Sequence, residues 1–437
     1  MSLFAIAWKS IRQRLLVSSL TSFSVALAVA LMVTVLVIHG VVSQMFNQNA
    51  TGYDLVVGAK GSSLQLVLNT IFFVDKPIEN IPYKYYKQLA ALKSVEMAVP
   101  IALGDSTADG KYRIVGTTTD YFGIEYIPGR RFHLAEGAMF GKAFEAVIGA
   151  KVARTYGWKV GSEFPIAHGG NTEDIHKEIF KVVGVLSATG TPADRAVFVH
   201  LDGFYQMAGH DKPLDEALEK ERQAAGGEQE IGKRPASVPV ADRAPPKAGE
   251  LPDEQKEVTA VLLRFRAGRM TSIRMMEGQI NDGLTAQAVS PLRQILWLMR
   301  NVVGNIQTAL MALTFFILLV SGIGIFVSIY NSLAERRREI AILRALGANR
   351  MTIFAIILCE ATLLCLIGGV AGIVLGHGLV VVAAPIIEAR SDLLLNPWSF
   401  ETAELALFPL LLVIAGCVGM AAGTAAYRTD VARGLQG

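Results

Sequence analysis

Long apolar segments alternate with polar ones along the chain. Four segments carry almost no charged residues: 15–42, 306–333, 351–387 and 405–427. Each is longer than the roughly 20 residues that a helix needs to cross the hydrocarbon core of a bilayer. The pattern therefore predicts an integral membrane protein with four transmembrane helices per chain.

The region between the first two apolar segments reads as a large water-soluble domain. Short apolar runs, several ending in glycine, predict strands over 53–58, 111–116, 144–149, 179–185 and 196–199. Alternation predicts a half-buried strand over 258–266, and helical patterns cover 83–92, 151–156 and 270–281. The predicted fold class is a membrane α-helical protein with an α+β extracytoplasmic domain between spans one and two.

Two parts of this domain leave alternatives open. The apolar group 71–74, which includes Phe72 and Phe73, predicts a core strand or an exposed contact patch. Residues 211–257 are rich in Glu, Lys, Ala, Pro and Gly and have almost no aromatic residues. Such a segment cannot bury enough apolar area to offset its ordering entropy, so it is interpreted as a flexible insertion.

Basic residues set the predicted orientation. They precede span one, lie between spans two and three, and follow span four: Lys9, Arg12, Arg14, Arg336, Arg337, Arg338, Arg344, Arg350, Arg428 and Arg433. If successive spans cross the membrane in opposite directions, these three groups of basic residues lie on the same side of the membrane. The positive-inside rule predicts that this side is the cytoplasm. Both termini are then cytoplasmic, and the large domain is periplasmic.

The predicted order of segments follows directly. It begins with a cytoplasmic amphipathic helix (1–14), transmembrane helix 1 (15–43) and the periplasmic domain (44–300). It continues with transmembrane helix 2 (301–333), a cytoplasmic helix (334–350) and transmembrane helix 3 (351–386). It ends with a short periplasmic loop (387–404), transmembrane helix 4 (405–427) and a cytoplasmic tail (428–437). From Ser290 the chain is expected to run helically into span two as a stiff lever, or to turn near Asn301–Asn305.

Composition narrows the function. Hydrophobic residues make up 52% of the chain and charged residues 18%, below the ~25% of soluble domains, while a net charge of +3 gives no reason to expect nucleic acid. The three cysteines all lie within predicted spans. A P-loop, a Ser-His-Asp arrangement and a His-Glu-x-x-His motif are absent from the sequence, so enzyme function has no support.

The segment between spans two and three is unusually rich in charge. Its helical pattern places apolar residues on one side and charged residues on the others, and Gly347 suits a helix end. The residues predicted to dock a soluble partner are Glu335, Arg336, Arg337, Arg338, Glu339, Ile340, Leu343, Arg344, Leu346 and Gly347. A purely topogenic basic loop is the alternative, but it would not require glutamates or an apolar stripe.

This segment resembles the signature of the FtsX/MacB-like (type VII) permeases of ABC transporters. Other motifs agree with the resemblance along nearly the whole chain: 7–12, Tyr121-Phe122, Gly129-Arg130, 147–149, 182–185 and 427–430. The resemblance implies a non-catalytic subunit that works as a homodimer or heterodimer in the inner membrane. ATP and Mg²⁺ would bind a separate ATPase that docks on the charged segment, with no cofactor on this chain. The insertion 211–257 departs from the family pattern.

The resemblance also implies a mechanical role. ATP binding would move the spans and the periplasmic domain, exporting or extracting a periplasmic or membrane-derived substrate, with an adaptor or carrier protein as a further partner. The alternatives are a relay that regulates cell-wall hydrolases, as attributed to FtsX, and a lipoprotein-releasing subunit like LolC/LolE.

Four further residues carry hypotheses. Glu360 is an intramembrane carboxylate, expected to pack or gate helices rather than relay protons. No metal site is predicted; His39 and His377, at similar depth in spans one and three, are the weak candidates for one. His168 and His176 flank Glu173 and Asp174 in a loop; they are expected to be solvated, and a metal site there is the weaker alternative.

Overall fold

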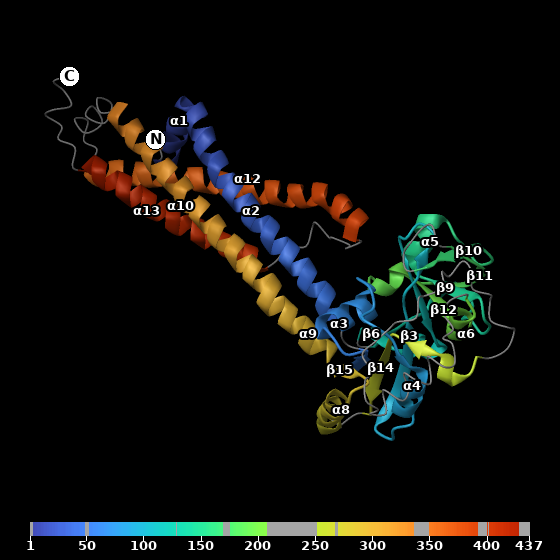
Figure 1. Ribbon diagram of the computed structural model, residues 1–437. Coiled ribbons are helices and arrows are strands. Elements are labelled where there is room, and N and C mark those ends of the chain that lie inside the picture. The colour runs from blue at the N-terminus through green and yellow to red at the C-terminus, as the bar shows by residue number, and fades with distance from the viewer. Residues whose placement is uncertain are drawn as a thin grey trace, which may run out of the picture. The chain divides into compact units, whose positions relative to one another are not determined.

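The computed structural model describes residues 3–48, 52–127, 129–168, 175–207, 251–266, 270–335, 349–391, 400 and 402–427. The chain forms two compact units (Figure 1). The helical unit comprises Met1–Gln44 and Met299–Gly437, and the sheet unit comprises Met45–Leu298. Each unit has its own core, so each is described by itself.

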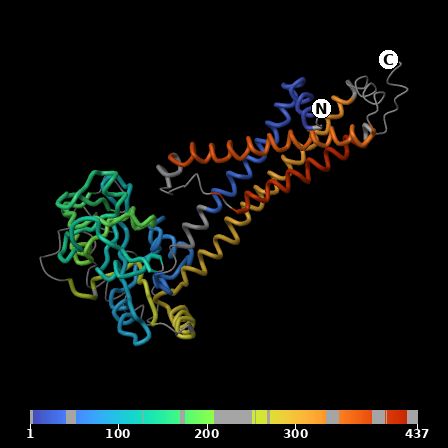
Figure 2. The backbone as a smooth tube through the Cα atoms, turned by 180° about the vertical axis from the view of Figure 1, so that it is seen from behind, coloured from blue at the N-terminus to red at the C-terminus, as the bar shows by residue number. Residues whose placement is uncertain are grey.

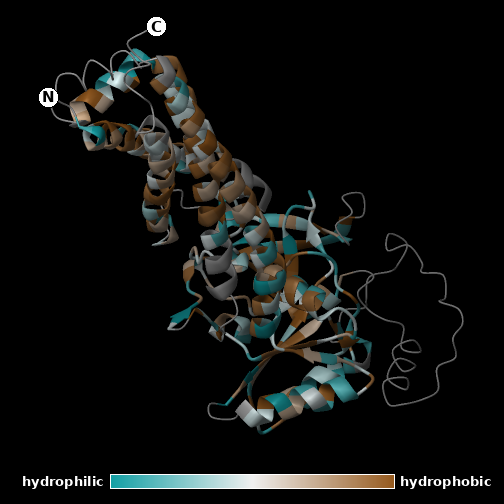
Figure 3. Ribbon diagram, turned by 90° about the vertical axis from the view of Figure 1, so that its left-hand side faces the viewer, coloured by the Kyte–Doolittle hydropathy of each residue, from teal (hydrophilic) through white to brown (hydrophobic). Residues whose placement is uncertain are grey.

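The helical unit contains four helices that are long and apolar enough to cross a membrane. Its elements are α1 (Leu3–Gln13), α2 (Leu15–Gln48), a π-helical segment (Met299–Val303), α10 (Gly304–Glu335), α12 (Arg350–Ser391), a 3₁₀ turn η7 (Thr402–Ala406) and α13 (Leu407–Tyr427). Hydrophobic residues predominate along the long helices (Figure 3), and many of them are exposed, such as Leu20, Phe316 and Val374. This confirms the predicted four-span fold class.

Three of these helices are longer than a bilayer requires. At 1.5 Å per residue, α2 and α10 are roughly 50 Å long and α12 is roughly 60 Å, against about 30 Å of hydrocarbon. The chain is helical without interruption from Pro291 to Glu335, through the π-helical segment at Met299–Val303. The predicted continuous helix into span two is therefore confirmed, and the alternative of a turn near 301–305 is wrong; the role of this helix as a lever stays a prediction.

The sheet unit holds a mixed sheet flanked by short helices. Its first elements are β1 (Leu55–Gly58), α3 (Ser63–Phe72), β2 (Ile81–Pro82), α4 (Tyr83–Ala90), β3 (Val95–Ala102), β4 (Ser106–Thr107), β5 (Arg113–Thr117), β6 (Glu125–Ile127), β7 (Arg130–Arg131), β8 (Leu134–Gly137) and β9 (Glu145–Ile148). The remainder are α5 (Ala150–Tyr156), β10 (Glu163–Ala167), β11 (Ile175–Leu186), β12 (Ala196–His200), α6 (Leu201–Tyr205), β13 (Glu257–Val258), β14 (Ala260–Phe265), α8 (Met270–Asp282), β15 (Gln287–Val289) and α9 (Pro291–Leu298). All six predicted strands are confirmed.

Strand pairing divides the sheet into two parts. The order is β12-β9-β11-β10-β4-β5-β3-β14-β1-β15, and a parallel β12–β5 ladder joins the first strand back to the sixth. Strands β12, β9, β11, β10, β4 and β5 therefore close a ring. Phe164, Ile166, Phe180, Val197 and Val199 belong to one buried cluster that these strands contribute to. A second cluster lies where α4 and α8 meet β1, β3, β14 and β15.

Two local predictions differ from the structure. Residues 71–74 do not form a strand: α3 ends at Phe72, and Phe73 terminates it in a left-handed conformation with φ 56°. Buried positions 66, 67, 70 and 71 follow helical spacing, which a four-residue apolar run could not reveal. In the predicted insertion, 211–250 lies outside the described residues. However, Lys256 is buried and its Nζ lies 3.4 Å from Asp202 Oδ1, so the last residues of the predicted insertion pack against the sheet unit.

Candidate functional site

The predicted docking segment falls largely outside the described residues. Of its ten named residues, only Glu335 is described, as the last residue of α10, and the other nine lie within 336–348. The far end of the segment is well defined. Asn349 caps α12 by accepting hydrogen bonds at Oδ1 from the Thr352 backbone N–H (2.7 Å) and hydroxyl (2.8 Å). The segment therefore leads directly into a capped, stiff helix.

Helix α1 packs on α12 close to that end. Ala7, Ser10 and Ile11 form its buried side, and the Ser10 hydroxyl donates to Glu360 Oε1 at 3.1 Å. Glu360 is itself buried, so its carboxylate lies against protein rather than open to lipid. This placement is compatible with the predicted packing role, which stays a prediction.

A row of glycines brings α12 against α2. Gly368, Gly372 and Gly376 recur every four residues, so they share one face of α12. A Cβ on Gly372 would lie 2.6 Å from Val29 Cβ and 2.7 Å from Ala26 O, and Gly368 and Gly376 have equivalent contacts one turn away on either side. Glycine is required here because the two backbones approach too closely for any side chain. Figure 2 shows these two helices from behind.

Other contacts tie the remaining helices to α12 and α2. Cβ atoms on Gly419 and Gly423 of α13 would clash with Leu358 and Phe354 of α12. The Ser24 and Ser321 hydroxyls join α2 to α10 at 2.8 Å. Within the described residues, α12 is thus the helix in contact with α1, α2, α10 and α13.

The two histidines considered for metal binding lie in this bundle. His377 of α12 is buried, with Nε2 3.0 Å from Glu404 Oε2 and its ring 4.6 Å from that of Phe400. His39 lies on α2. In the part of the chain that the structure describes, no group of three or more potential metal ligands contains either histidine, and the expectation that they hold no metal stays untested.

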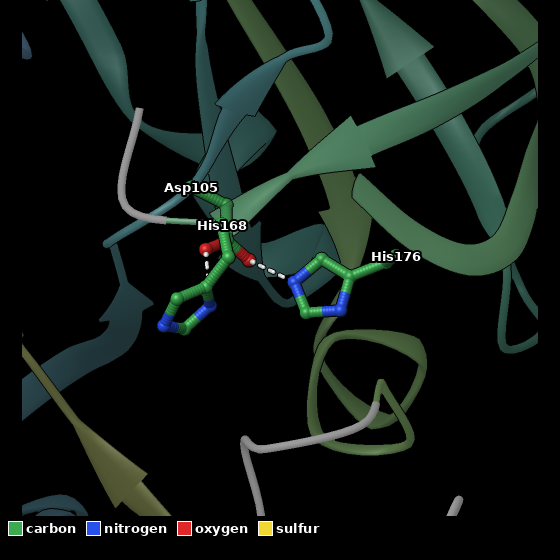
Figure 4. A group of neighbouring side chains, drawn as sticks. All are labelled: Asp105, His168 and His176. Carbon is green, nitrogen blue, oxygen red and sulfur yellow. Dashed lines mark ion pairs between the residues drawn. The ribbon is translucent and has the colours of Figure 1, made fainter. Parts of the chain in front are cut away.

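A polar cluster does form in the sheet unit, from Asp105, His168 and His176 (Figure 4). The carboxylate of Asp105 lies between the two imidazole rings, with Oδ1 3.3 Å from His168 Nδ1 and Oδ2 3.7 Å from His176 Nε2. The side chains of Asp105 and His176 are fully buried, and that of His168 is 36% exposed. The prediction that both histidines are solvated is therefore wrong for His176, which stands in β11. Glu173 and Asp174 lie outside the described residues.

The hairpin that follows Asp105 is held by its own polar contacts. Asp109 accepts hydrogen bonds from Tyr156 Oη, Thr107 Oγ1 (2.7 Å) and the Lys111 N–H (3.2 Å). Partial desolvation would raise the pKa of Asp109, but these hydrogen bonds outweigh it and lower the pKa below its ordinary value. Burial, and next the Asp109 hydrogen bond, raise the pKa of Tyr156. These contacts fix the turn between β4 and β5.

Sequence reasoning missed two of these features, for different reasons. The four-residue spacing of Gly368, Gly372 and Gly376 was a readable signal, since small residues at this spacing mark close helix packing in membranes. Asp105 carried no such signal, because strand pairing alone brings it to the histidines.

Two family models match the chain. The FtsX-like permease C-terminal model matches residues 311–430, and the MacB-like periplasmic core domain matches residues 18–223. The macrolide export ATP-binding/permease protein MacB of Bordetella avium is 26% identical over 73% of this chain and 46% of its own length. The uncharacterized ABC transporter permease YknZ of Bacillus subtilis is 48% identical over 14% of this chain and 15% of its own.

A solved structure is also similar. The periplasmic region of MacB from Actinobacillus actinomycetemcomitans aligns with a TM-score of 0.34 and 9% identity, covering 60% of this chain and 98% of that one. The chain spans less than half the length of the first curated relatives it matches.

Proposed function

Because this chain belongs to the FtsX/MacB-like permeases of ABC transporters, we propose that it converts ATP binding and hydrolysis by a separate ATPase into movement of its sheet unit. The sheet unit, matched by a MacB-like periplasmic core domain between the first two spans, would stand in the periplasm of an inner-membrane protein with both termini in the cytoplasm. Two such chains, or this chain and a related permease, would form the working dimer.

The proposed input is the segment 335–349. Its apolar and charged faces suit a groove on the ATPase, with Leu343 and Arg344 at the contact. Displacement of the segment would act on the capped first turn of α12. Coupling requires that ATP bias two discrete arrangements of the helices, and an ATPase groove that moves with nucleotide supplies such a bias.

The observation that carries the proposal is the glycine row between α12 and α2. A Cβ on Gly372 has no space against Val29 and Ala26. Because the two backbones are in direct contact, with no flexible side chains between them, we infer that α12 and α2 move together. Helix α2 leads along the chain into the sheet unit, and α10 leads out of it. Motion of α12 would therefore reach the domain that would handle substrate through α2, which α12 contacts, and through α10, which precedes α12 in the chain.

The proposed outcome is export or extraction of a periplasmic or membrane-derived substrate, handed to an adaptor or carrier. The Bordetella relative is named for macrolide export, a description that applies to that protein. A MacB-like core domain in the sheet unit favours transport over a minimal relay of cell-wall hydrolysis.

The docking step is tested by co-purification with candidate ATPases. The double variant Leu343→Asp, Arg344→Glu should lose the complex and any stimulation of ATP hydrolysis, because it places charge on the apolar face and reverses the basic one. Arg12→Glu, a charge reversal at an exposed position of α1, serves as control and should retain both. Unaltered assembly and hydrolysis in the double variant would refute docking at this segment.

A further inference from the structure

Three adjacent strands bring Asp105, His168 and His176 to one end of the sheet. Asp105 precedes β4, His168 follows β10, and His176 is the second residue of β11. The register pairs Ala167 with Ser106 on one side and with Ile175 on the other. The three residues are therefore set by the ladder, and their potential ligand atoms all lie within 4.8 Å of one another.

The spacing of these atoms suits ligands that share one ion. Ligands held 2.0–2.2 Å from a tetrahedral ion lie about 3.4 Å apart. The two Asp105–histidine separations are 3.3 and 3.7 Å, and the second exceeds the 2.7–3.2 Å of an ordinary N–H···O bond. The rings stand at 79° with centroids 5.4 Å apart, so both present a nitrogen to the carboxylate without stacking.

The burial of Asp105 is compatible with a bound cation. A carboxylate taken fully out of water is costly unless a cation or several donors compensate it. The Asp105 side chain is fully buried, whereas His168 reaches solvent. A divalent ion would supply the charge, and the His168 side would give it an entry path and an open coordination position.

The donor set indicates the class of ion. Two imidazoles and one carboxylate suit zinc and other first-row divalent transition ions, while Mg²⁺ and Ca²⁺ prefer oxygen ligands alone. We propose that Asp105, His168 and His176 form a binding site for such an ion, Zn²⁺ foremost. The site clamps β4, β10 and β11 at one end of the ring. It stands apart from the proposed coupling to an ATPase, which none of these residues enters.

Zinc uptake by the full-length chain tests the proposal. Tag-free protein in detergent is stripped with a chelator and titrated with ZnCl₂, with MgCl₂ as the comparison, and bound metal is counted per chain. We expect one zinc ion per chain and none of the magnesium. His168→Ala should weaken zinc binding by more than about 100-fold, because losing a ligand exceeds the 10–100-fold loss that outer-shell changes cause. His133→Ala, an exposed histidine of the same unit, should bind like the wild type.

Two further readouts separate coordination from folding. Zinc should raise the unfolding temperature of the wild type and of His133→Ala but not of His168→Ala, since a ligand stabilises the state that binds it. Co²⁺ should give the strong visible absorption of a tetrahedral site only where all three ligands remain. Should His176→Ala or Asp105→Asn fail to fold, the partly exposed His168 still decides the matter. A stripped wild type that takes up no zinc, or equal uptake by His168→Ala, would overturn the proposal.

Discussion

The cores of the two units depend on different side chains. In the helical unit, α12 meets α2 through residues without side chains, as at Gly372 against Ala26 and Val29. In the sheet unit, aromatic rings pack against one another: the Phe198 ring lies 4.8 Å from that of Tyr121 and 5.3 Å from that of Phe122. Apolar side chains gain little by leaving lipid, so membrane helices depend on close backbone contact, whereas a water-exposed domain gains from burying area.

The difference has a mechanical consequence. A ring of strands filled with aromatic and branched side chains resists deformation because interiors packed at this density transmit strain. Helices held together by a narrow glycine row can move together as stiff rods. This contrast agrees with the proposed mechanism, in which the helical unit would move the sheet unit.

The largest expected effect is on the sheet unit. Phe198→Ala should lower its free energy of unfolding by about 3–5 kcal/mol, since a fully buried ring among three aromatic neighbours would leave a cavity. Denaturant unfolding of the full chain, followed by near-ultraviolet circular dichroism, measures it. Leu284→Ala, at a 74% exposed position, should cost less than about 0.5 kcal/mol. Similar costs for both variants would contradict an aromatic core.

In the helical unit, Gly372→Leu should cost about 1–3 kcal/mol or more, because the new side chain must separate two backbones. Thermal unfolding in detergent reports the loss. Gly378→Leu, on the same helix but with no atom within 4 Å of the added Cβ, is the matched control and should leave stability near the wild type. Equal losses at 372 and 378 would mean that helix propensity matters and close packing does not.

A smaller effect is expected at Glu360. Glu360→Gln retains an oxygen that accepts the hydrogen bond from Ser10, and a neutral hydrogen bond contributes only about 0.5–1.5 kcal/mol. Stimulation of the ATPase by this variant should therefore stay within about twofold of the wild type at every pH measured. Glu360→Leu, which removes the acceptor, should lower the stimulation of the ATPase further. A pH-dependent collapse in Glu360→Gln alone would instead indicate a proton relay.

The smallest effect is electrostatic. Because its pKa is lowered below 3.8 in the folded state, Asp109 stabilises the protein above that pH, and the contribution is lost as pH falls through the folded pKa. The group is exposed, so Asp109→Asn should cost only a few tenths of a kcal/mol at pH 7. The difference between variant and wild type should vanish well below pH 3.8. A difference that persists at low pH would assign the effect to packing.

How much could be predicted from the sequence depended on the range of the interactions. Apolar runs of more than 20 residues allow one interpretation, so the four spans were predictable. The run 71–74 was too short to separate strand from helix, and it ends α3. Asp105 meets His168 and His176 only through the ladders among β4, β10 and β11, a non-local pairing that no local pattern encodes.

The central claim is that motion passes from α12 to the sheet unit through the glycine row. It is tested most directly by fluorophores at Leu284 of the sheet unit and Val382 of α12, both exposed, after replacing Cys359, Cys365 and Cys417. In complex with the ATPase, ATP should change the distance between the fluorophores in the wild type and in Gly378→Leu. In Gly372→Leu the ATPase should still co-purify, but the ATP-dependent change in distance should be lost. In Gly372→Ala the ATPase should also co-purify, and the change in distance should be reduced. An ATP-dependent change of full size in Gly372→Leu would contradict the claim.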